Sequence, residues 1–305
     1  MSVALVIVNW NGLGDTLACL ESLRASTQPV HAIVVDNDSA GDDLERLRAS
    51  GLAGEVIAAE SNLGFAAGSN AGLERALAGG FALVGVLNND TVVEPESIAR
   101  LAEHLPEGRE RAISPDIRYF DEPERSWFAG GVLDRGWPRH LQPSELSASN
   151  DPLRDCDCLS GCCIVARREV WQRVGLFDPR YFLIFEDSDW SMRARREGVE
   201  LCVATASAIR HKVSRTISRG SASLLSDFYF ARNGLIFDAT YCRRFLPSFL
   251  MRWLIRPSAS ALLRRRAQPG LGFRWLGALA FLTRRHGRAP AWLERLAARA
   301  VSGSR

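Results

Sequence analysis

Four short apolar runs recur through the first ninety residues of the chain, and text with helical periodicity follows each of them. The runs are VALVIVN (3–9), HAIVVD (31–36), EVIAA (55–59) and FALVGVL (81–87). Continuous apolar runs of this length are typical of strands that are covered on both faces. Repeated strand–helix units predict a mostly parallel sheet with right-handed crossovers, in which ligands bind beyond the carboxyl ends of the strands.

Polar or permissive residues stand where these strands are expected to end. They are Asn9-Trp10-Asn11-Gly12, Asp36-Asn37-Asp38-Ser39, Asn62-Leu63-Gly64-Phe65 with Asn70 in the next helix, and Asn88-Asn89-Asp90. Ordinary turn preferences explain any one of these loops, but they explain four aligned loops poorly. We therefore expect the four loops to form a binding site at one edge of the sheet.

The chemistry expected at this edge is nucleotide binding without a P-loop. No GxxxxGK[ST] occurs, and the turn after the first strand reads NWNGLGD instead of the GxGxxG of nicotinamide-binding proteins. A carboxylate at the end of the second strand can accept a hydrogen bond from the N3–H of uracil or thymine, or from a ribose hydroxyl. Asp90 is suited to a hard divalent cation, which would neutralise a diphosphate.

The stretch FEDSDW (185–190) gathers three acidic residues, Glu186, Asp187 and Asp189, directly after an apolar run. Such a cluster is costly to bury unless its charges are compensated. A helix is expected to begin here, and its N-terminal N–H groups would stabilise Asp187, while Asp189 would face Arg193 one turn later. On its own, the cluster would also fit a simple helix cap.

Beyond residue 110 the pattern changes. Shorter strand-like text covers about 112–140, and Arg139–Asp155 is expected to be a polar loop. A strand then leads into a helix that stops at Gly175, the helix after Asp187 ends at Gly198, and the strand VELCVAT (199–205) follows. From about residue 222 onward the text is helical and rich in arginine.

An ordered series of motifs resembles the inverting family 2 glycosyltransferases, and most closely their bacterial rhamnosyltransferase-like branch. The motifs are VIVNWNG, VVDNDSAGDD, NLGFAAGSNAGL, LNNDTVVEP, SGCCIVARREVWQRVGLFDPRYFLIFEDSDWSMRARREG and FYFARNGL. They span roughly residues 3 to 235 in the family's order. The resemblance implies a GT-A fold: a single mostly parallel, Rossmann-like sheet flanked by helices, here with a C-terminal helical extension. It implies a nucleotide-sugar-binding half (1–110), an acceptor-binding and catalytic half (111–220) and a basic amphipathic helical region (221–305).

The resemblance also implies roles for individual residues. Asp187, the Asp after Glu in the family's ED motif, would be the catalytic base. Asp36 would contact the nucleobase, and Glu186 would hold an acceptor hydroxyl. The other expected substrate-binding residues are Asn9, Asn62, Gly64, Phe65, Asn70, Asn88, Asn89, Arg232 and Asn233.

The implied cofactor is Mg²⁺ or Mn²⁺, held by Asp90 of a DxD-like motif. The first acid of a strict DxD motif is replaced by Asn88, which leaves one carboxylate for the metal. His211, in IRHKVSRT, aligns with a histidine that completes the metal or diphosphate site in some relatives. A structural histidine is the alternative reading.

Charge and cysteine usage bear on partners and location. Residues 221–305 contain 15 Arg, no Lys and 3 acidic residues, a balance of +12, whereas the rest of the chain carries −9. This composition is typical of helices at an anionic membrane interface, although a subunit interface fits it as well, and no nucleic-acid motif accompanies it. Seven cysteines without a CxxC pair favour a reducing compartment and packing roles over zinc. No signal peptide or membrane-spanning run is visible, so we expect a cytoplasmic protein, with a peripheral position at the inner membrane.

The sequence therefore predicts an inverting glycosyltransferase of cell-surface polysaccharide synthesis. The expected donor is deoxythymidine-diphosphate rhamnose, then a uridine-diphosphate sugar, and the acceptor is a saccharide or a lipid-linked saccharide. A sugar-phosphate nucleotidyltransferase is one alternative, although NWNGLGD lacks the arginine of that class. A catalytically inactive nucleotide- or saccharide-binding protein is the other.

Overall fold

The computed structural model describes residues 1–146, 151–213, 221–264 and 269–302 of the chain. Residues 147–150 of the predicted polar loop, 214–220 after the IRHKV segment and 265–266 of LLRRR lie outside the described residues. The chain divides into two compact units. The first comprises Met1–Leu133, Pro138–Asp178 and Asp187–Val213, and the second comprises Asp134–Trp137, Pro179–Glu186 and the C-terminal region from residue 214.

The first unit is built on a ten-stranded sheet with the order β10-β12-β6-β11-β4-β1-β2-β3, to which β5 and β7 add at β12 and β6. One parallel group consists of β1 (Val3–Asn9), β2 (Val30–Asp36), β3 (Glu55–Ala58) and β4 (Leu83–Leu87). The other strands are β5 (Thr91–Val93), β6 (Arg111–Tyr119), β7 (Ser126–Phe128), β10 (Leu153–Asp155), β11 (Cys163–Arg167) and β12 (Glu200–His211). β6 and β12 form a second parallel pair. A separate hairpin consists of β8 (Gly131–Asp134) and β9 (Trp137–His140).

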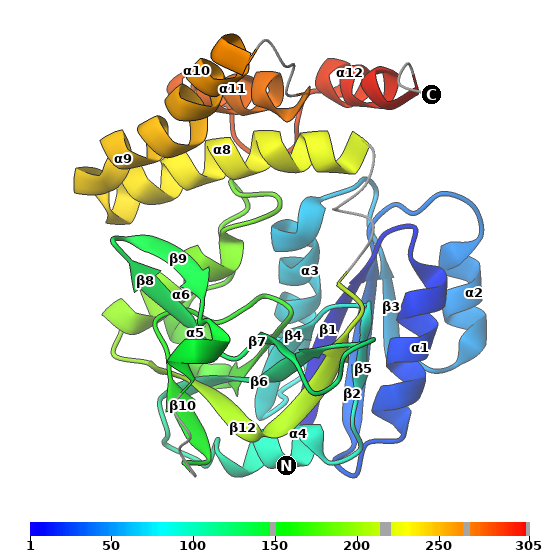
Figure 1. Cartoon of the computed structure of the whole chain (residues 1–305). Helices are drawn as coiled ribbons and strands as arrows, with labels where there is room; N and C mark the ends of the chain where they lie inside the picture. The colour runs from blue at the N-terminus through cyan, green and yellow to red at the C-terminus, as the bar shows by residue number, and fades with distance from the viewer. Residues whose placement is uncertain (147–150, 214–220, 265–268, 303–305) are drawn as a thin grey trace. The chain divides into compact units, whose positions relative to one another are not determined.

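Helices cover both faces of this sheet, as the continuous apolar runs predict (Figure 1). Val3, Leu5 and Ile7 of β1 face one core, whereas Ala4 and Val6 face the other. The first core is closed by α1 (Leu13–Arg24), α2 (Asp43–Ser50) and α4 (Ser97–Glu103), and the second by α3 (Gly64–Ala78), α5 (Arg168–Val174) and α6 (Glu186–Arg196). Burying each large aliphatic side chain contributes about 1.5–3 kcal/mol, so the two cores fix β1 at the centre.

An antiparallel strand joins the two halves of the sheet. β11 lies between β4 and β6 and runs antiparallel to both. Gly85 of β4 pairs with Val165, and a Cβ atom at Gly85 would lie 2.4 Å from the carbonyl oxygen of Ile164. Only glycine therefore permits the observed approach of β4 and β11.

Three strands differ from the sequence prediction. β10 lies at the end of the predicted polar loop Arg139–Asp155 and is a strand because it pairs with β12. β12 extends from Glu200 to His211, well beyond the predicted VELCVAT, because a bulge between Ala204 and Ala208 lets it continue along β6. β5 was not predicted: its three residues pair with the end of β12. Together they carry His211 to the residues that follow β4.

Six of the seven cysteines lie in the first unit, and Cys242 lies in the second. Cys19, Cys158, Cys162 and Cys163 are buried, and no disulfide joins the cysteines of the described residues. Burial raises the pKa of the Cys156 thiol to about 12, so this group stays protonated and apolar at neutral pH. Within the described ranges, no three His, Cys, Asp or Glu residues group as a metal site.

The second unit is helical, as expected for the C-terminal region. Its elements are α8 (Ser221–Tyr241), short turns at Arg243–Phe245 and Met251–Ile255, α9 (Leu246–Leu250), α10 (Arg256–Arg264), α11 (Pro269–Leu282) and α12 (Ala291–Ser302). α8 is buried on all sides from Ala231 to Asp238, and α9, α11 and α12 pack against it. Among the described helices, none combines the length and apolar character that crossing a bilayer requires. Sheet, flanking helices and helical C-terminal region confirm the predicted fold class.

Replacing Asp238 with Asn should stabilise the protein selectively at high pH. Asp238 is 2% exposed, its Oδ1 atom has no hydrogen-bond partner among the residues that the structure describes, and burial raises its pKa from 3.8 to about 6. The folded state thus binds this proton more tightly than the unfolded state, so this group's destabilisation develops as pH rises through its native pKa. The melting temperature of Asp238→Asn relative to wild type should be clearly more favourable at about pH 8 than at about pH 5. An offset that does not change between the two pH values would contradict this.

Candidate active site

Asn9 and Asp36 form a buried polar pair at the carboxyl ends of β1 and β2, where they are register partners. Asn9 Nδ2 donates to Asp36 Oδ1 over 2.9 Å, and the hydroxyl of Thr16 donates to Asn9 Oδ1 over 2.6 Å. The other carboxylate oxygen of Asp36 accepts the backbone N–H of Ser39. Asn9 therefore orients the carboxylate of Asp36, and the predicted alignment of these strand ends is confirmed.

The loop after β3 is shaped by Asn37, a residue that the sequence interpretation did not select. Asn37 Oδ1 accepts the N–H of Leu63 over 2.9 Å, and its Nδ2 donates to Asn62 Oδ1 over 3.1 Å. Gly64 opens α3 with φ of 79°, a left-handed conformation that favours glycine. Asn62, Gly64 and Phe65 thus follow β3 beside the end of β2, as predicted.

Asn70 is occupied by a backbone contact. Its Nδ2 donates to the carbonyl of Phe177 over 2.8 Å, and its Oδ1 accepts the N–H of the same residue over 3.0 Å. Both ends of the amide are therefore engaged within the first unit. We interpret Asn70 as a residue that fixes the segment after α5; its predicted nucleotide contact stays a prediction.

Asp90 and His211 meet through the pairing of β5 with β12. His211 Nε2 lies 3.0 Å from Asp90 Oδ1, and both side chains are buried. Asp90 Oδ2 and His211 Nδ1 have no hydrogen-bond partner among the described residues. Lys212 follows the pair: its backbone N–H donates to the carbonyl of Asp90, and its Nζ donates to Asp15.

This pair fits a hexacoordinate divalent cation that also takes oxygen ligands from a substrate. Two ligand atoms at about 2.1 Å from an ion and at right angles to each other lie about 3.0 Å apart. The separation between His211 Nε2 and Asp90 Oδ1 has this value. The unpartnered Asp90 Oδ2 adds a further acceptor that a cation would satisfy. Mg²⁺ and Mn²⁺ commonly bind with one or two protein ligands and complete their shell from phosphates and water.

Asn88 and Asn89 support the strand end. The backbone N–H of Asn88 donates to the carbonyl of Cys162 over 2.8 Å, and Asn89 Nδ2 donates to Thr16 Oγ1 over 3.0 Å. Because Thr16 also binds Asn9, one hydroxyl links the ends of β1 and β4. Their neutral amides leave Asp90 as the carboxylate of this motif.

Asp187 lies in the first turn of α6, and three donors hold its carboxylate. Oδ2 accepts the N–H of Gly161 over 2.9 Å, and Oδ1 accepts both the N–H of Ser188, over 2.6 Å, and its hydroxyl, over 3.2 Å. A Cβ atom at Gly161 would lie 3.4 Å from Asp187 Cβ and 3.2 Å from the ring of Phe65. The helix start predicted for Asp187 is confirmed.

The turn at Gly161 and Cys162 brings the neighbourhoods of Asp187 and Asp90 together. Gly161 binds the carboxylate of Asp187, and the next residue, Cys162, binds the backbone of Asn88, two positions before Asp90. The pKa of the Cys162 thiol is raised well above 9, first by burial and then by charges that include both carboxylates. The Gly161–Cys162 turn therefore contacts both the start of α6 and the strand end that leads to Asp90.

Two aromatic residues near this edge had no role in the sequence interpretation. The ring of Trp127 contacts His211 at 4.6 Å and His140 at 4.9 Å between centroids, edge to face in both cases. Burial lowers the pKa of His140, while its bond to the Trp127 carbonyl and the charge of Asp187 oppose this. Trp127 thus orients His211 from β7, a strand too short for its pattern to be distinctive.

Arg232 and Asn233, predicted to contact substrate, hold backbone within the second unit. Asn233 Nδ2 donates to the carbonyls of Tyr181, Leu183 and Ile184 over 2.7–2.8 Å. Arg232 donates to the carbonyls of Arg180, Tyr181 and Gly287. Both side chains are almost completely buried. We interpret them as positioning residues for the loop that leads into FEDSDW.

The other two acids of the cluster are buried, whereas Asp187 is partly exposed. Glu186 is 6% exposed at the start of α6. Asp189 Oδ2 lies 3.0 Å from Arg193 Nε, which confirms the predicted pairing one turn apart. Arg193 in turn donates to the carbonyls of Val174 and Leu176. Asp189 is therefore engaged in anchoring α6, which leaves Asp187 as the candidate for the predicted base.

Sequence comparisons point to one family. A family model described as "Glycosyltransferase like family 2" matches residues 2–226. The chain is 35% identical over 106 residues to an N-acetylglucosaminyl-diphospho-decaprenol L-rhamnosyltransferase of Mycobacterium tuberculosis, covering 31% of this chain and 32% of that protein. It is 27% identical over 216 residues to galactofuranosyltransferase GlfT1 of the same organism, covering 69% and 70%. The chain thus matches about a third of the rhamnosyltransferase's length.

Solved structures share the fold. S. aureus TarS 1-349 in complex with UDP-GlcNAc has a TM-score of 0.56 at 15% identity, covering 82% of this chain and 72% of that one. The mannosyltransferase PcManGT from Pyrobaculum calidifontis, in complex with GDP-Man and Mn²⁺, has a TM-score of 0.55 at 14% identity, covering 99% and 80%. The likeness confirms the predicted GT-A fold.

Replacing Asn233 with Ala should lower stability more than an ordinary polar truncation on α8. The change removes one amide that binds three carbonyls and leaves these partly buried groups without their donor, at an expected cost of about 2–4 kcal/mol. Thr240→Ala on the same helix loses a single bond to the carbonyl of Ile236 and should cost less than about 1 kcal/mol. Denaturant unfolding of the two variants measures the difference. Equal losses would show that the Asn233 contacts contribute nothing special.

Proposed function

Because the chain belongs to the glycosyltransferase-like family 2, we propose that it is an inverting glycosyltransferase that uses a nucleoside-diphosphate sugar. The observation that carries this proposal is the Gly161–Cys162 turn. It binds Asp187 through one residue and the strand end that leads to Asp90 through the next. A proton acceptor and a cation site at one edge of a nucleotide-binding sheet are what this transfer requires.

In the proposed reaction, Asp187 removes the proton of the acceptor hydroxyl. The hydroxyl oxygen attacks the anomeric carbon, and the nucleoside diphosphate leaves from the opposite face, so that one displacement inverts the configuration. Gly161 and Ser188 keep the carboxylate of Asp187 oriented. A divalent cation bound at Asp90 and His211 would supply the charge that stabilises the leaving diphosphate.

For the donor, we propose deoxythymidine-diphosphate rhamnose, with a uridine-diphosphate sugar as the next choice. Asp36, oriented by Asn9, is positioned at the end of β2 to accept from the N3–H of thymine or uracil. The rhamnosyltransferase relative supports rhamnose, and the TarS complex supports a uridine nucleotide. Cytosine presents an acceptor at N3 and would be repelled by this carboxylate.

For the acceptor, we propose a saccharide or lipid-linked saccharide of cell-surface polysaccharide synthesis. The N-acetylglucosaminyl-diphospho-decaprenol L-rhamnosyltransferase relative supports the lipid-linked choice. We also propose that the protein works at the cytoplasmic face of the inner membrane, in peripheral contact through its arginine-rich C-terminal helices. A lipid-linked acceptor would be found there.

Replacing Asp187 with Asn should reduce sugar transfer by about 10²–10⁴-fold, because the amide cannot take the acceptor's proton. Nucleotide binding should survive, since Asn keeps an oxygen for the Gly161 N–H. Asp189→Asn, two residues along the same helix, is the matched control and should retain transfer below its own melting temperature. Turnover and nucleotide affinity are measured for all three proteins. Unchanged turnover in Asp187→Asn would remove Asp187 as the base and would favour a different enzyme class.

Thymidine or uridine diphosphate should raise the melting temperature only when Mg²⁺ or Mn²⁺ is present. Asp90→Asn and His211→Ala should each raise the metal concentration needed for the same shift in melting temperature about tenfold. Each substitution removes one of the two proposed protein ligands. His104→Ala is the control, because His104 lies at the opposite end of β12 from the proposed metal site. The His104 carbonyl accepts from Arg111, which pairs with the first residue of β12, whereas His211 is the last residue of that strand. A full shift without metal would contradict the cation site, and a response to saccharide without any nucleotide would favour a binding protein.

A further inference from the structure

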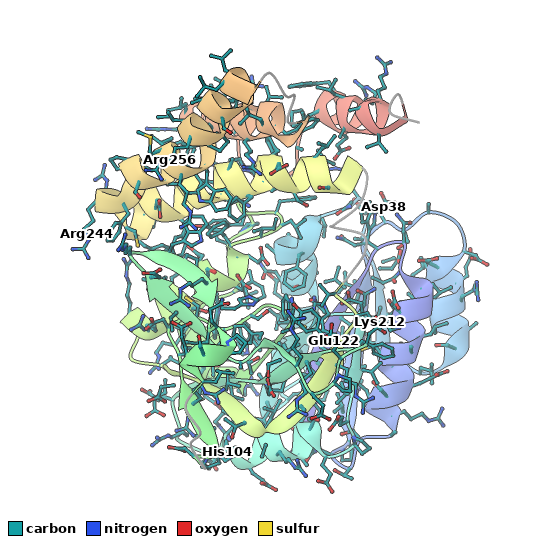
Figure 2. The ribbon with its side chains drawn as sticks, in the orientation of Figure 1. Asp38, His104, Glu122, Lys212, Arg244 and Arg256 are labelled. Carbon is teal, nitrogen blue, oxygen red and sulfur yellow. The ribbon has the colours of Figure 1, made fainter. Side chains whose placement is uncertain are left out.

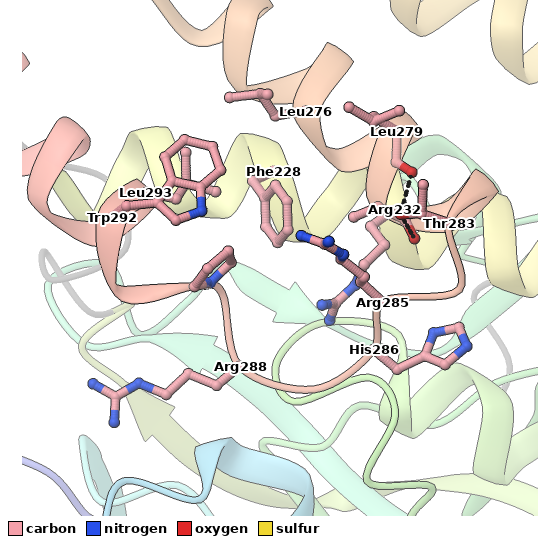
Figure 3. Close-up of a pocket in the computed structure, with 12 residues that line it drawn as sticks. Phe228, Arg232, Leu276, Leu279, Thr283, Arg285, His286, Arg288, Trp292 and Leu293 are labelled. Carbon is pink, nitrogen blue, oxygen red and sulfur yellow. Dashed lines mark hydrogen bonds between the residues drawn. The ribbon is translucent and has the colours of Figure 1, made fainter.

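The second unit contains a cationic pocket that the transfer reaction does not use. It has a volume of about 180 Å³ and lies between α8, α11, α12 and the segment that joins the last two helices (Figure 3). Arg232, Arg285, His286 and Arg288 line it, and none of its described lining residues is acidic. A pocket with three arginines and no carboxylate in its lining is suited to an anion.

One of these cations is buried without a countercharge. Arg232 is 1% exposed, and its guanidinium donates to carbonyls and to Asn233 Oδ1. Within the described part of the chain, no carboxylate lies within ion-pair distance of it. Burial lowers its pKa to about 10, so the group stays charged at neutral pH. A buried charge that only neutral dipoles compensate is stabilised further by an anion.

A second cation is exposed beside it. α11 ends with Arg284 in the left-handed conformation, at φ of 55°, and the N–H of Arg285 donates to the carbonyl of Ala280. This helix ending usually has glycine at the position of Arg284. The turn directs the chain so that Arg285, an exposed residue, lines the pocket. Arg285 has no ion-pair partner among the described residues, whereas Arg288 pairs with Glu294.

The rim of the same pocket is apolar and exposed. Leu279 is 54% exposed and Trp292 is 48% exposed, and both line the pocket. Leu279 belongs to a stripe on α11 with Trp275 and Leu282, spaced as successive turns of one helix face. Large exposed apolar residues of this kind mark a contact surface.

The charge around this surface identifies the partner's chemistry. Residues 221–305 carry +12, and exposed arginines such as Arg244 and Arg256 lie on the helices of this unit (Figure 2). Apolar side chains mixed with arginines fit the boundary between acyl chains and anionic head groups. A protein partner would need an apolar groove and a negatively charged surface in matching positions. An anionic bilayer offers apolar acyl chains and negative head groups over its whole surface.

We propose that the pocket binds the phosphate of an anionic phospholipid while the apolar stripe of Trp275, Leu279 and Leu282 enters the bilayer interface. Arg285 and Arg232 supply the charge, and Leu279 and Trp292 contact the start of the acyl chains. The proposal deepens the membrane contact proposed above and is independent of the transferase activity. The bound lipid is a constituent of the membrane and is distinct from donor and acceptor.

Vesicle flotation of the full chain tests the proposal, without donor, acceptor or metal. Binding to vesicles of phosphatidylcholine with phosphatidylglycerol at about 0.15 M salt is expected, with much weaker binding to phosphatidylcholine alone. Because no substrate is present, failure here and failure of the transferase proposal are distinguishable. Absence of binding to the anionic vesicles would overturn the proposal that the pocket binds an anionic phospholipid.

A pair of adjacent arginines provides the matched comparison. Arg284→Gln and Arg285→Gln each remove one exposed arginine from the same turn, but only Arg285 lines the pocket. Loss of a general surface charge weakens binding about fivefold, and loss of a charge-assisted bond to phosphate weakens it by more than about tenfold. Arg285→Gln should therefore have clearly the larger effect. Equal effects would reduce the pocket to general surface charge and overturn the proposal.

The remaining arms separate the lipid from other occupants. A short-chain phosphatidylglycerol below its micelle concentration should compete with vesicles, and inorganic phosphate at the same concentration should compete much less. Equal competition would overturn the lipid in favour of a simple anion site. A dimer that forms without vesicles and dissociates in Arg285→Gln, together with absent vesicle binding, would replace the bilayer with a second copy of the chain.

Discussion

The hydrogen bonds of the Gly161–Cys162 turn are the interactions on which the candidate site depends. The turn precedes β11, an antiparallel strand inserted between β4 and β6, so its place is fixed by pairing on both sides. From there it binds Asp187 in one direction and Asn88 in the other. Asp187 and Asp90 belong to separate elements, α6 and the segment after β4. The turn before the inserted strand β11 is what connects these two elements through hydrogen bonds.

Much of this could be predicted from the sequence, because the period of the apolar runs and the polar residues at their ends carry strong local signals. The parallel strands, the shared edge with Asn9 and Asp36, and the helix start at Asp187 follow from such signals. Placement of His211 beside Asp90 could not be derived from pattern alone. It depends on a bulge in β12 and on pairing with a three-residue strand, and neither has a distinctive composition.

Three predicted substrate-binding residues make backbone contacts that the sequence did not indicate, and these contacts share a physical reason. Asn70, Arg232 and Asn233 are polar residues in motifs, and polar residues in motifs suggest ligands. In the structure each is committed to backbone carbonyls or N–H groups of a loop distant in sequence. The sequence shows which side chains are polar, but it does not show which backbone N–H or carbonyl groups will be their hydrogen-bond partners. Irregular loops near active sites have many such groups, and burial there requires partners.

The loop before FEDSDW shows why such partners matter. Phe182, Ile184 and Phe185 all have positive φ, a conformation that costs bulky residues about 1–3 kcal/mol each. A regular strand or helix would avoid this cost and satisfy its own carbonyls, but it would not turn the chain sharply into α6. In the irregular loop, the side-chain amide of Asn233 donates hydrogen bonds to the backbone carbonyls that have no partner within a regular strand or helix. The hydrogen bonds of Asn233 therefore offset the backbone strain of this loop. A side chain at position 233 that cannot donate hydrogen bonds would let the loop relax to a less strained conformation before α6.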